Sequence, residues 1–230
     1  GYEIGMILGT AMAVGTVLAP FIGGQLADRH FSTQRFLAVS MLIGGAINWV
    51  LADPTGFWPW LILSTIYAIV YMPTIGLTNS LAMSHLSDSK RQFPGVRVWG
   101  TIGWIAVAWV FPMVWLQSDL SFRWLPPFFK GVDLPNATSR IADALKASGL
   151  LSFIYGVFCL FLPDTPPNRN AKQRFAFAKA FGLVKHRSVL VLILATLPLA
   201  VIHKIFFLQA APFLQSIGLD KGYIMPAMSI

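Results

Sequence analysis

The chain has 230 residues, of which 56% are hydrophobic and 11% are charged. A soluble globular domain carries about 25% charged residues, so the composition is typical of a membrane protein and excludes a soluble domain. The net charge of +8 comes from residues that lie between apolar segments, a pattern that indicates membrane orientation and no nucleic-acid partner.

Six apolar stretches approach or exceed the roughly 20 residues that cross a bilayer as a helix. They are residues 3–27, 35–53, 57–84, 95–117, 147–163 and 189–216. A seventh stretch begins near Tyr223, and we do not expect the opening stretch after Gly1 to be a signal peptide, because it has no basic segment before it and is too long. We therefore expect an all-α membrane protein, and we interpret the chain as a piece of a longer polytopic protein.

The basic residues divide the connections between the spans into two sets. Segments 28–35, 85–94 and 164–188 hold ten Lys and Arg residues, whereas the other connections hold five. Cytoplasmic loops of membrane proteins are enriched in Lys and Arg, so the first set is predicted to be cytoplasmic. Segment 164–188 is long, basic and partly amphipathic, which suits a linker between two helix bundles or a helix on the membrane surface.

Small residues within the spans favour close packing of helices, because packing drives helix association in lipid. They include Gly5 and Gly9 in the first span, Gly44 and Gly45 beside Asn48 in the second, and Gly149 and Gly156 in the fifth. This pattern predicts structure and carries no chemistry.

The third span, 57–84, carries a polar face. Tyr67, Tyr71, Thr74 and Thr78 recur at spacings of three or four residues, with Asn79 beside them. Pro73 frees a backbone carbonyl, which membrane helices tolerate where a cavity or a neighbour satisfies it. The face suits either a ligand cavity or hydrogen bonds between helices.

The fourth span places an arginine inside an apolar helix, in "FPGVRVWGTIGW". If the helix begins near Phe93, Arg97 lies about 6 Å inside it, shallow enough to reach the membrane surface. Arg97, Thr101 and Trp104 share one helix face. An arginine fork binds carbonyl oxygens, and an indole stacks on a planar ring. The pattern predicts a site for a polar ligand with a flat ring. The alternative interpretation, that this face packs against another helix, stays open.

The sixth span, 189–216, holds His203, Lys204 and Gln209 between Pro198 and Pro212. An intramembrane lysine usually faces a cavity or a partner, and His203 can titrate near neutral pH or simply be hydrogen-bonded. All nine acidic residues fall at helix ends or in loops. The one cysteine, Cys159, forms no disulfide framework, and we predict no metal site.

The stretch "GGQLADRHFSTQR", residues 23–35, resembles the loop motif of the major facilitator superfamily, with Gly24, Asp28 and Arg29 as the matching residues. In that superfamily the loop joins the second and third of twelve helices. The resemblance implies that the chain holds helices two to seven and the start of eight. It also implies an N-terminal bundle (1–163), a cytoplasmic linker (164–188) and the start of a C-terminal bundle (189–230).

Two further stretches, "YMPTIGLTNSLAMSHL" (71–86) and "FPGVRVWGTIGWI" (93–105), resemble the nucleoside-proton symporter family within that superfamily. This resemblance implies a multi-pass importer of nucleosides in a cell inner membrane, working by alternating access. It also implies that Arg97, Thr101 and Trp104 contact the nucleoside. The expected partners are the nucleoside and membrane lipid. No cofactor is expected, and protons are the expected coupling ion. The coupling carboxylates are expected in later helices.

The resulting prediction for the binding site joins three segments. Its residues are Tyr71, Thr78, Asn79, Arg97, Thr101, Trp104, His203, Lys204 and Gln209. Three alternatives stay open: a symporter of sugars or oligosaccharides, a non-transporting sensor on the same scaffold, and a membrane enzyme. We predict that the protein is no enzyme, because the nearest catalytic pattern, His85 with Asp88, lacks a third member.

Overall fold

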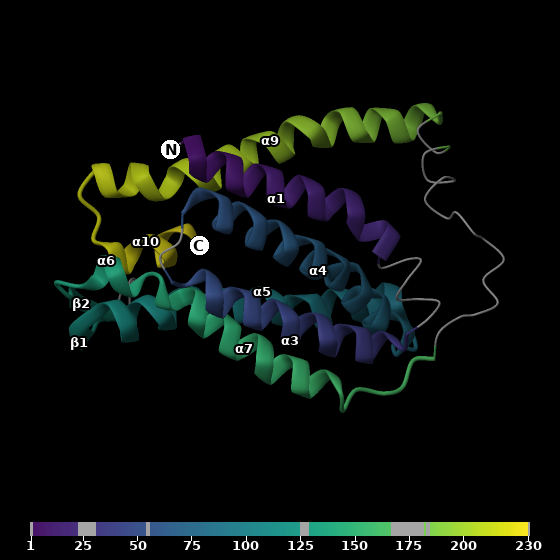
Figure 1. Cartoon of the computed structure of the whole chain (residues 1–230), viewed down its shortest axis with the longest axis horizontal. Coiled ribbons are helices and arrows are strands. Elements are labelled where there is room, and N and C mark those ends of the chain that lie inside the picture. Colours follow the sequence, from purple (N-terminus) through teal and green to yellow (C-terminus); the bar gives the residue numbers. More distant parts are fainter. Residues whose placement is uncertain are drawn as a thin grey trace. The chain divides into compact units, whose positions relative to one another are not determined.

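A computed structural model of the chain describes residues 2–22, 31–53, 56–124, 129–166, 182 and 185–229. The elements are drawn in chain order in Figure 1. They are α1 (Tyr2–Phe21), α3 (Thr33–Leu51), α4 (Phe57–Ser84), α5 (Ser89–Phe111), η2 (Pro112–Leu116), β1 (Gln117–Phe122), β2 (Phe129–Asp133), α6 (Ala137–Arg140), α7 (Asp143–Cys159), α9 (Arg187–Ser216) and α10 (Lys221–Met228).

The six predicted spans are confirmed as helices. Within the described residues, six helices are long and apolar enough to cross a membrane, and they run over Tyr2–Phe21, Thr33–Leu51, Phe57–Ser84, Ser89–Leu116, Ala137–Cys159 and Arg187–Ser216. Uninterrupted apolar sequence favours helices here because a helix satisfies its own backbone hydrogen bonds without water. The predicted seventh segment is the helix α10, which begins at Lys221.

Two compact units make up the chain: residues 1–89 with 145–185, and residues 90–144 with 186–230. The first unit contains α1, α3, α4 and most of α7. The second contains α5, η2, the two strands, α6, α9 and α10. The predicted division into bundles on either side of 164–188 runs across these units and stays a prediction.

Helices of the first unit pack through small residues at two levels of an antiparallel pair, α3 and α7. At one level an added Cβ on Gly45 would lie 2.8 Å from the backbone oxygen of Gly149. An added Cβ on Gly149 would lie equally close to the backbone oxygen of Gly45. At the other level an added Cβ on Gly156 would lie 3.1 Å from the backbone oxygen of Ala38. In lipid, such close approach of backbones supplies the packing that holds helices together.

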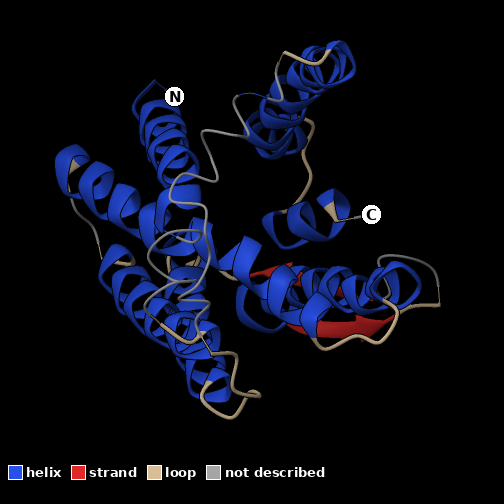
Figure 2. Cartoon of the chain, turned by 90° about the vertical axis from the view of Figure 1, so that its right-hand side faces the viewer, coloured by secondary structure: helices blue, strands red, loops and turns tan. Residues whose placement is uncertain are grey.

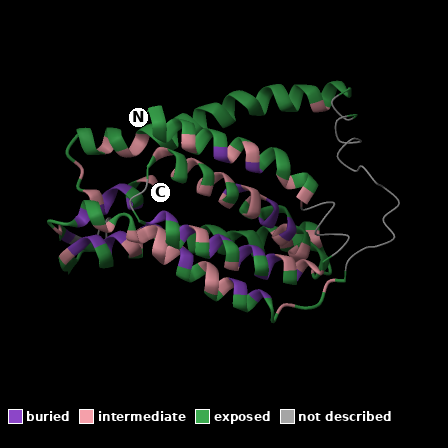
Figure 3. Cartoon of the chain, viewed as in Figure 1, coloured by how far each residue is buried: buried purple, intermediate pink, exposed green. Residues whose placement is uncertain are grey.

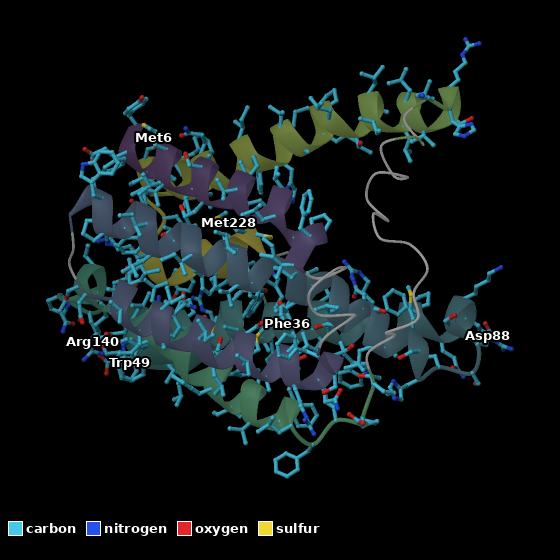
Figure 4. All side chains as sticks on the ribbon, turned by 45° about the vertical axis from the view of Figure 1, so that its right-hand side comes forward. Met6, Phe36, Trp49, Asp88, Arg140 and Met228 are labelled. Carbon is cyan, nitrogen blue, oxygen red and sulfur yellow. The ribbon has the colours of Figure 1, made fainter. Side chains whose placement is uncertain are left out.

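A small apolar cluster continues this interface into α4. Leu37, Ala38, Leu77 and Cys159 are buried together, and Phe36, labelled in Figure 4, packs against them. Gly15 of α1 sits equally close to Ala68 of α4, where an added Cβ would lie 2.7 Å from the Ala68 Cβ. For Gly5 and Gly9 close packing stays a prediction, because among the described residues no atom comes within 4 Å of an added Cβ at either position.

The second unit contains a two-stranded antiparallel sheet that the sequence analysis did not predict. β1 pairs with β2 from Gln117 opposite Asp133 to Phe122 opposite Phe129, with a bulge between Ser118 and Ser121. Asp119 in the bulge has a φ of 52°, a conformation that Asp adopts more readily than most residues. Figure 2 shows the two strands among helices. We call residues 117–133 the hairpin.

Three contacts join connections that lie between different pairs of helices. Lys146 pairs with Asp53 at 3.3 Å, joining the connection after α3 to the start of α7. The backbone N–H of Thr33 donates to the Thr165 carbonyl at 3.4 Å, joining the segments before α3 and after α7. In the second unit, the Lys221 N–H donates to Asp133 at 2.7 Å. Each contact joins two connections that the alternation of spans places on the same side of the membrane.

Candidate nucleoside-binding surfaces

The helix α5 carries Arg97, Thr101 and Trp104 on one exposed face. At about 100° per residue, the three directions fall within about 60° of each other. The helix begins at Ser89, earlier than the expected start near Phe93, so Arg97 lies about 12 Å from the helix start. Pro94 stands in the second turn, where it removes one backbone donor.

The face of α5 is open within the described chain. Trp104 is 51% exposed, and no described atom lies within 4 Å of an added Cβ at Gly100, about 60° around the helix from Arg97. In contrast to Thr65 and Thr196, whose hydroxyls donate to carbonyls four residues earlier at 2.7 and 2.9 Å, Thr101 forms no such bond among the described residues. Its hydroxyl is therefore not committed to its own helix.

The helix α4 holds the second predicted group, in the first unit. The Tyr67 and Tyr71 rings stack with centroids 5.3 Å apart and planes 10° apart. The Thr74 hydroxyl donates to the Tyr71 carbonyl at 2.6 Å, and Thr74 is only 2% exposed. Thr74 is thus satisfied by its own helix, while Tyr71 remains partly exposed.

Thr78 and Asn79 differ in their surroundings. The Thr78 side chain lies near the hydroxyl of Tyr155, a residue of α7 that the sequence analysis did not select. Asn79 is half-buried and lies about 100° around the helix from Thr78. The alternating tyrosine and threonine pattern of α4 cannot reveal Tyr155, because that residue comes from another helix far along the chain.

The helix α9 carries His203, Lys204 and Gln209, all exposed. No residue of α9 is buried, as its colour in Figure 3 shows. The His203 ring lies 4.8 Å from the Phe207 ring, one turn further on. At about 100° per residue the three polar side chains point in directions at least about 100° apart. A straight helix therefore cannot direct all three toward one ligand.

The remaining predicted residues are Gly24, Asp28 and Arg29 of the loop motif, and they lie outside the described residues. His85, part of the pattern considered for an enzyme, has its Nδ1 2.9 Å from the Leu81 carbonyl and 3.1 Å from the Ser84 hydroxyl. These contacts are local to the end of α4. Among the described residues, no group of three or more His, Cys, Asp or Glu side chains has a geometry that could hold a metal ion.

Comparison with known proteins identifies the family. The family model described as "Nucleoside H+ symporter" matches residues 1–230, the whole chain. The chain belongs to the nucleoside H+ symporter family. The prediction that rested on the two stretches at 71–86 and 93–105 is therefore confirmed at the level of the family.

Two relatives from Escherichia coli align with almost all of the chain. It is 33% identical to YegT of Escherichia coli (strain K12) over 213 residues, which are 91% of this chain and 47% of YegT. It is 26% identical to the nucleoside permease NupG of the same organism over 231 residues, or 97% of this chain and 50% of NupG. The chain thus spans about half the length of these curated relatives.

Solved structures agree on the fold. A crystal structure of a variant of the nucleoside transporter NupG aligns with 99% of the chain described here, and the alignment covers 54% of the NupG chain. The TM-score is 0.74 and the sequence identity is 24%. A second NupG crystal structure gives a TM-score of 0.66 at 23% identity. The chain therefore has part of the fold of the major facilitator superfamily, and it is a multi-pass membrane protein.

Proposed function

We propose that the full-length protein containing this chain imports nucleosides by proton symport with alternating access, in a cell inner membrane. The observation that carries this proposal is the family match over residues 1–230. The relatives named nucleoside permease and xanthosine permease support the substrate class.

On α5, Arg97, Thr101 and Trp104 supply the groups that a nucleoside needs. A nucleobase has carbonyl oxygens at its edge, which the arginine fork can bind through two N–H donors. Its flat ring can stack on an indole, and Trp104 lies one turn further along the same face as Thr101. The uncommitted Thr101 hydroxyl is suited to a ribose hydroxyl or a ring nitrogen.

On α4 and α9 the proposed contacts are Tyr71, Thr78, Asn79, His203, Lys204 and Gln209. Tyr71 offers a partly exposed ring, and the direction of Asn79 differs enough from that of Thr78 to contact another part of the ligand. The polar residues of α9 point in different directions. We therefore propose that one side of α9 contacts the ligand, and that the polar residues on its other sides pack against helices or bind water.

Proton coupling is proposed to use carboxylates that this chain does not contain. Within the described membrane helices, acidic residues stand only in first turns, Glu3 in α1 and Asp143 in α7. Helix rearrangement would accompany transport, with segment 164–188 joining two bundles and Gly24, Asp28 and Arg29 acting as a switch loop. No prosthetic group has a part in this mechanism.

The test is uptake of labelled uridine by the full-length protein in proteoliposomes with an inwardly directed proton gradient. We expect uptake that is inhibited by excess unlabelled nucleosides and unaffected by excess glucose or lactose. A pH-sensitive dye inside the vesicles should report proton entry on addition of uridine. Uptake that sugars inhibit and nucleosides do not would assign the protein to the sugar symporters, and absence of any uridine binding or uptake would contradict the proposal.

A further inference from the structure

The hairpin and the start of α10 are joined by several hydrogen bonds. Both belong to the second compact unit, and in Figure 1 the strands, α6 and α10 gather in one region. The hairpin precedes segment 164–188 and α10 follows it. The contacts therefore join parts of the chain that the proposed mechanism assigns to different bundles.

Asp133, at the end of β2, caps the N-terminus of α10. Its carboxylate accepts hydrogen bonds from the backbone N–H groups of Lys221 at 2.7 Å and Gly222 at 3.2 Å. The helix's own N-cap residue, Asp220, makes no side-chain capping bond. The first N–H groups of a helix need such an acceptor, and a carboxylate also interacts favourably with the helix dipole. A residue 88 positions earlier thus completes α10.

Tyr223 makes the second link. Its hydroxyl accepts a hydrogen bond from the backbone N–H of Gly131 at 2.9 Å, and it lies 3.3 Å from the Gly131 carbonyl, to which it donates. Both partners are buried. A phenol that satisfies both backbone groups of one strand residue fixes the position of α10 along β2.

Gly222 leaves no room for a side chain. An added Cβ there would overlap the side-chain amide of Gln117 in β1. Gln117 is 5% exposed and donates from Nε2 to Asp133 at 3.2 Å, but its Oε1 is buried without a hydrogen-bond partner in the described chain. A buried acceptor without a hydrogen-bond partner destabilises the closed contact, and water can bind this oxygen once the contact opens. The close fit therefore specifies the closed contact, while the unpaired Oε1 favours its opening.

We propose that Asp133, Gly222 and Tyr223, together with Gln117 and Gly131, form a latch that closes the external side of the transporter and opens once in each transport cycle. We call these five residues the hairpin latch. The inference rests on the proposed function for its role in transport, while the closed contact itself is independent of the substrate. The charge pattern places both connections on the external side.

A distance measurement tests the latch without reference to substrate. Spin labels are placed at Phe122 in β1 and Met225 in α10, both exposed, in full-length protein whose native cysteines are replaced. In nanodiscs the parent should give a dominant, narrow short distance and a small share of a longer one. Asp133→Asn and Gly222→Ala should each raise the share of a longer distance about five-fold, the effect of losing a helix cap.

The matched control is Asp119→Asn, in the same hairpin. Within the described residues the Asp119 carboxylate accepts one weak bond, from Ser118 at 3.4 Å, and Asn tolerates the positive φ of this position. It should leave the distance unchanged. Identical distance distributions in Asp133→Asn, Gly222→Ala and the parent would overturn the latch, whether or not the protein transports nucleosides.

A reversible cross-link tests whether the hairpin latch must open for transport. The Lys221 ammonium contacts the Thr138 hydroxyl, so Thr138→Cys with Lys221→Cys can be joined by a bifunctional thiosulfonate reagent. We expect uridine uptake to fall to background and to return with a reductant, whereas Thr138→Cys with Ser139→Cys, within one segment, should keep its uptake. Full uptake by the joined protein would overturn the proposal. Failure of the uncrosslinked parent to take up uridine would instead count against the proposed function.

Discussion

The contact between Gly45 and Gly149 predicts a specific loss of stability when Gly45 is replaced by alanine. The new Cβ would lie 2.8 Å from the Gly149 backbone oxygen, whereas ordinary contacts begin at 3.4 Å, so the helices α3 and α7 must separate by about 0.6 Å. The obstacle is a backbone atom, which cannot rotate away as a side chain could. Ser152 and Phe153 also lie within 3.4 Å of the new methyl group.

Two opposing effects set the size of the change. Overpacking a well-packed interface costs about 1–3 kcal/mol, and replacing a helical glycine by alanine returns up to about 1 kcal/mol. We therefore expect Gly45→Ala to reduce the free energy of unfolding by about 1–2 kcal/mol. The matched control is Gly76→Ala in α4, where no atom lies within 4 Å of an added Cβ, and the propensity gain should appear alone.

The assay is chemical unfolding of the purified full-length protein in mixed micelles, followed by circular dichroism. Both variants keep a helical residue at the changed position, so the comparison isolates the contact. If Gly45→Ala proves as stable as Gly76→Ala, the close approach of α3 and α7 is not present in the protein, and the reasoning about small residues fails with it.

Two polar contacts of the first unit give further predictions. The Asn48 amide donates to the Ser148 hydroxyl at 3.1 Å, and a double-mutant cycle with alanine at both positions should show a coupling of about 0.6 kcal/mol in unfolding free energy; additive effects would contradict this bond. Gln34 is 5% exposed, contacts Asp164, and accepts from the Thr165 N–H and hydroxyl at 3.1 and 2.8 Å. Gln34→Leu should therefore cost about 1–3 kcal/mol of stability and increase protease cleavage after α7, and unchanged cleavage would refute this anchoring role.

The membrane helices were predictable from the sequence because length and hydropathy are local properties. Pro73, Pro94, Pro198 and Pro212 all lie inside helices, and the apolar runs around them continue because the membrane leaves the backbone no other way to satisfy its hydrogen bonds. The hairpin was not predictable in this way. Its strands are short, separated by residues 123–128, and interrupted by the bulge at Asp119.

For the candidate site, the sequence could predict which residues share a face of one helix, but not which helices come together. Helical spacing correctly placed Arg97, Thr101 and Trp104 on one side of α5, since that is a property of one helix. It could not show that Thr74 is bonded to its own backbone, nor that Tyr155 of α7 reaches Thr78. Which helices meet around a nucleoside is set by contacts between distant segments, and that part of the predicted site remains a prediction.

The most direct test of the central claim is uridine binding to variants of α5 in the full-length protein, measured by equilibrium binding in nanodiscs. Arg97→Ala and Trp104→Ala should each weaken binding at least about five-fold, since base stacking contributes about 1–3 kcal/mol and a hydrogen bond from a charged group about 1.5–3 kcal/mol. Trp99→Ala is the matched control, because Trp99 is 73% exposed and lies about 200° around the helix from Arg97. Unchanged uridine affinity in the first two variants, with normal membrane insertion, would show that the face of α5 does not bind the nucleoside.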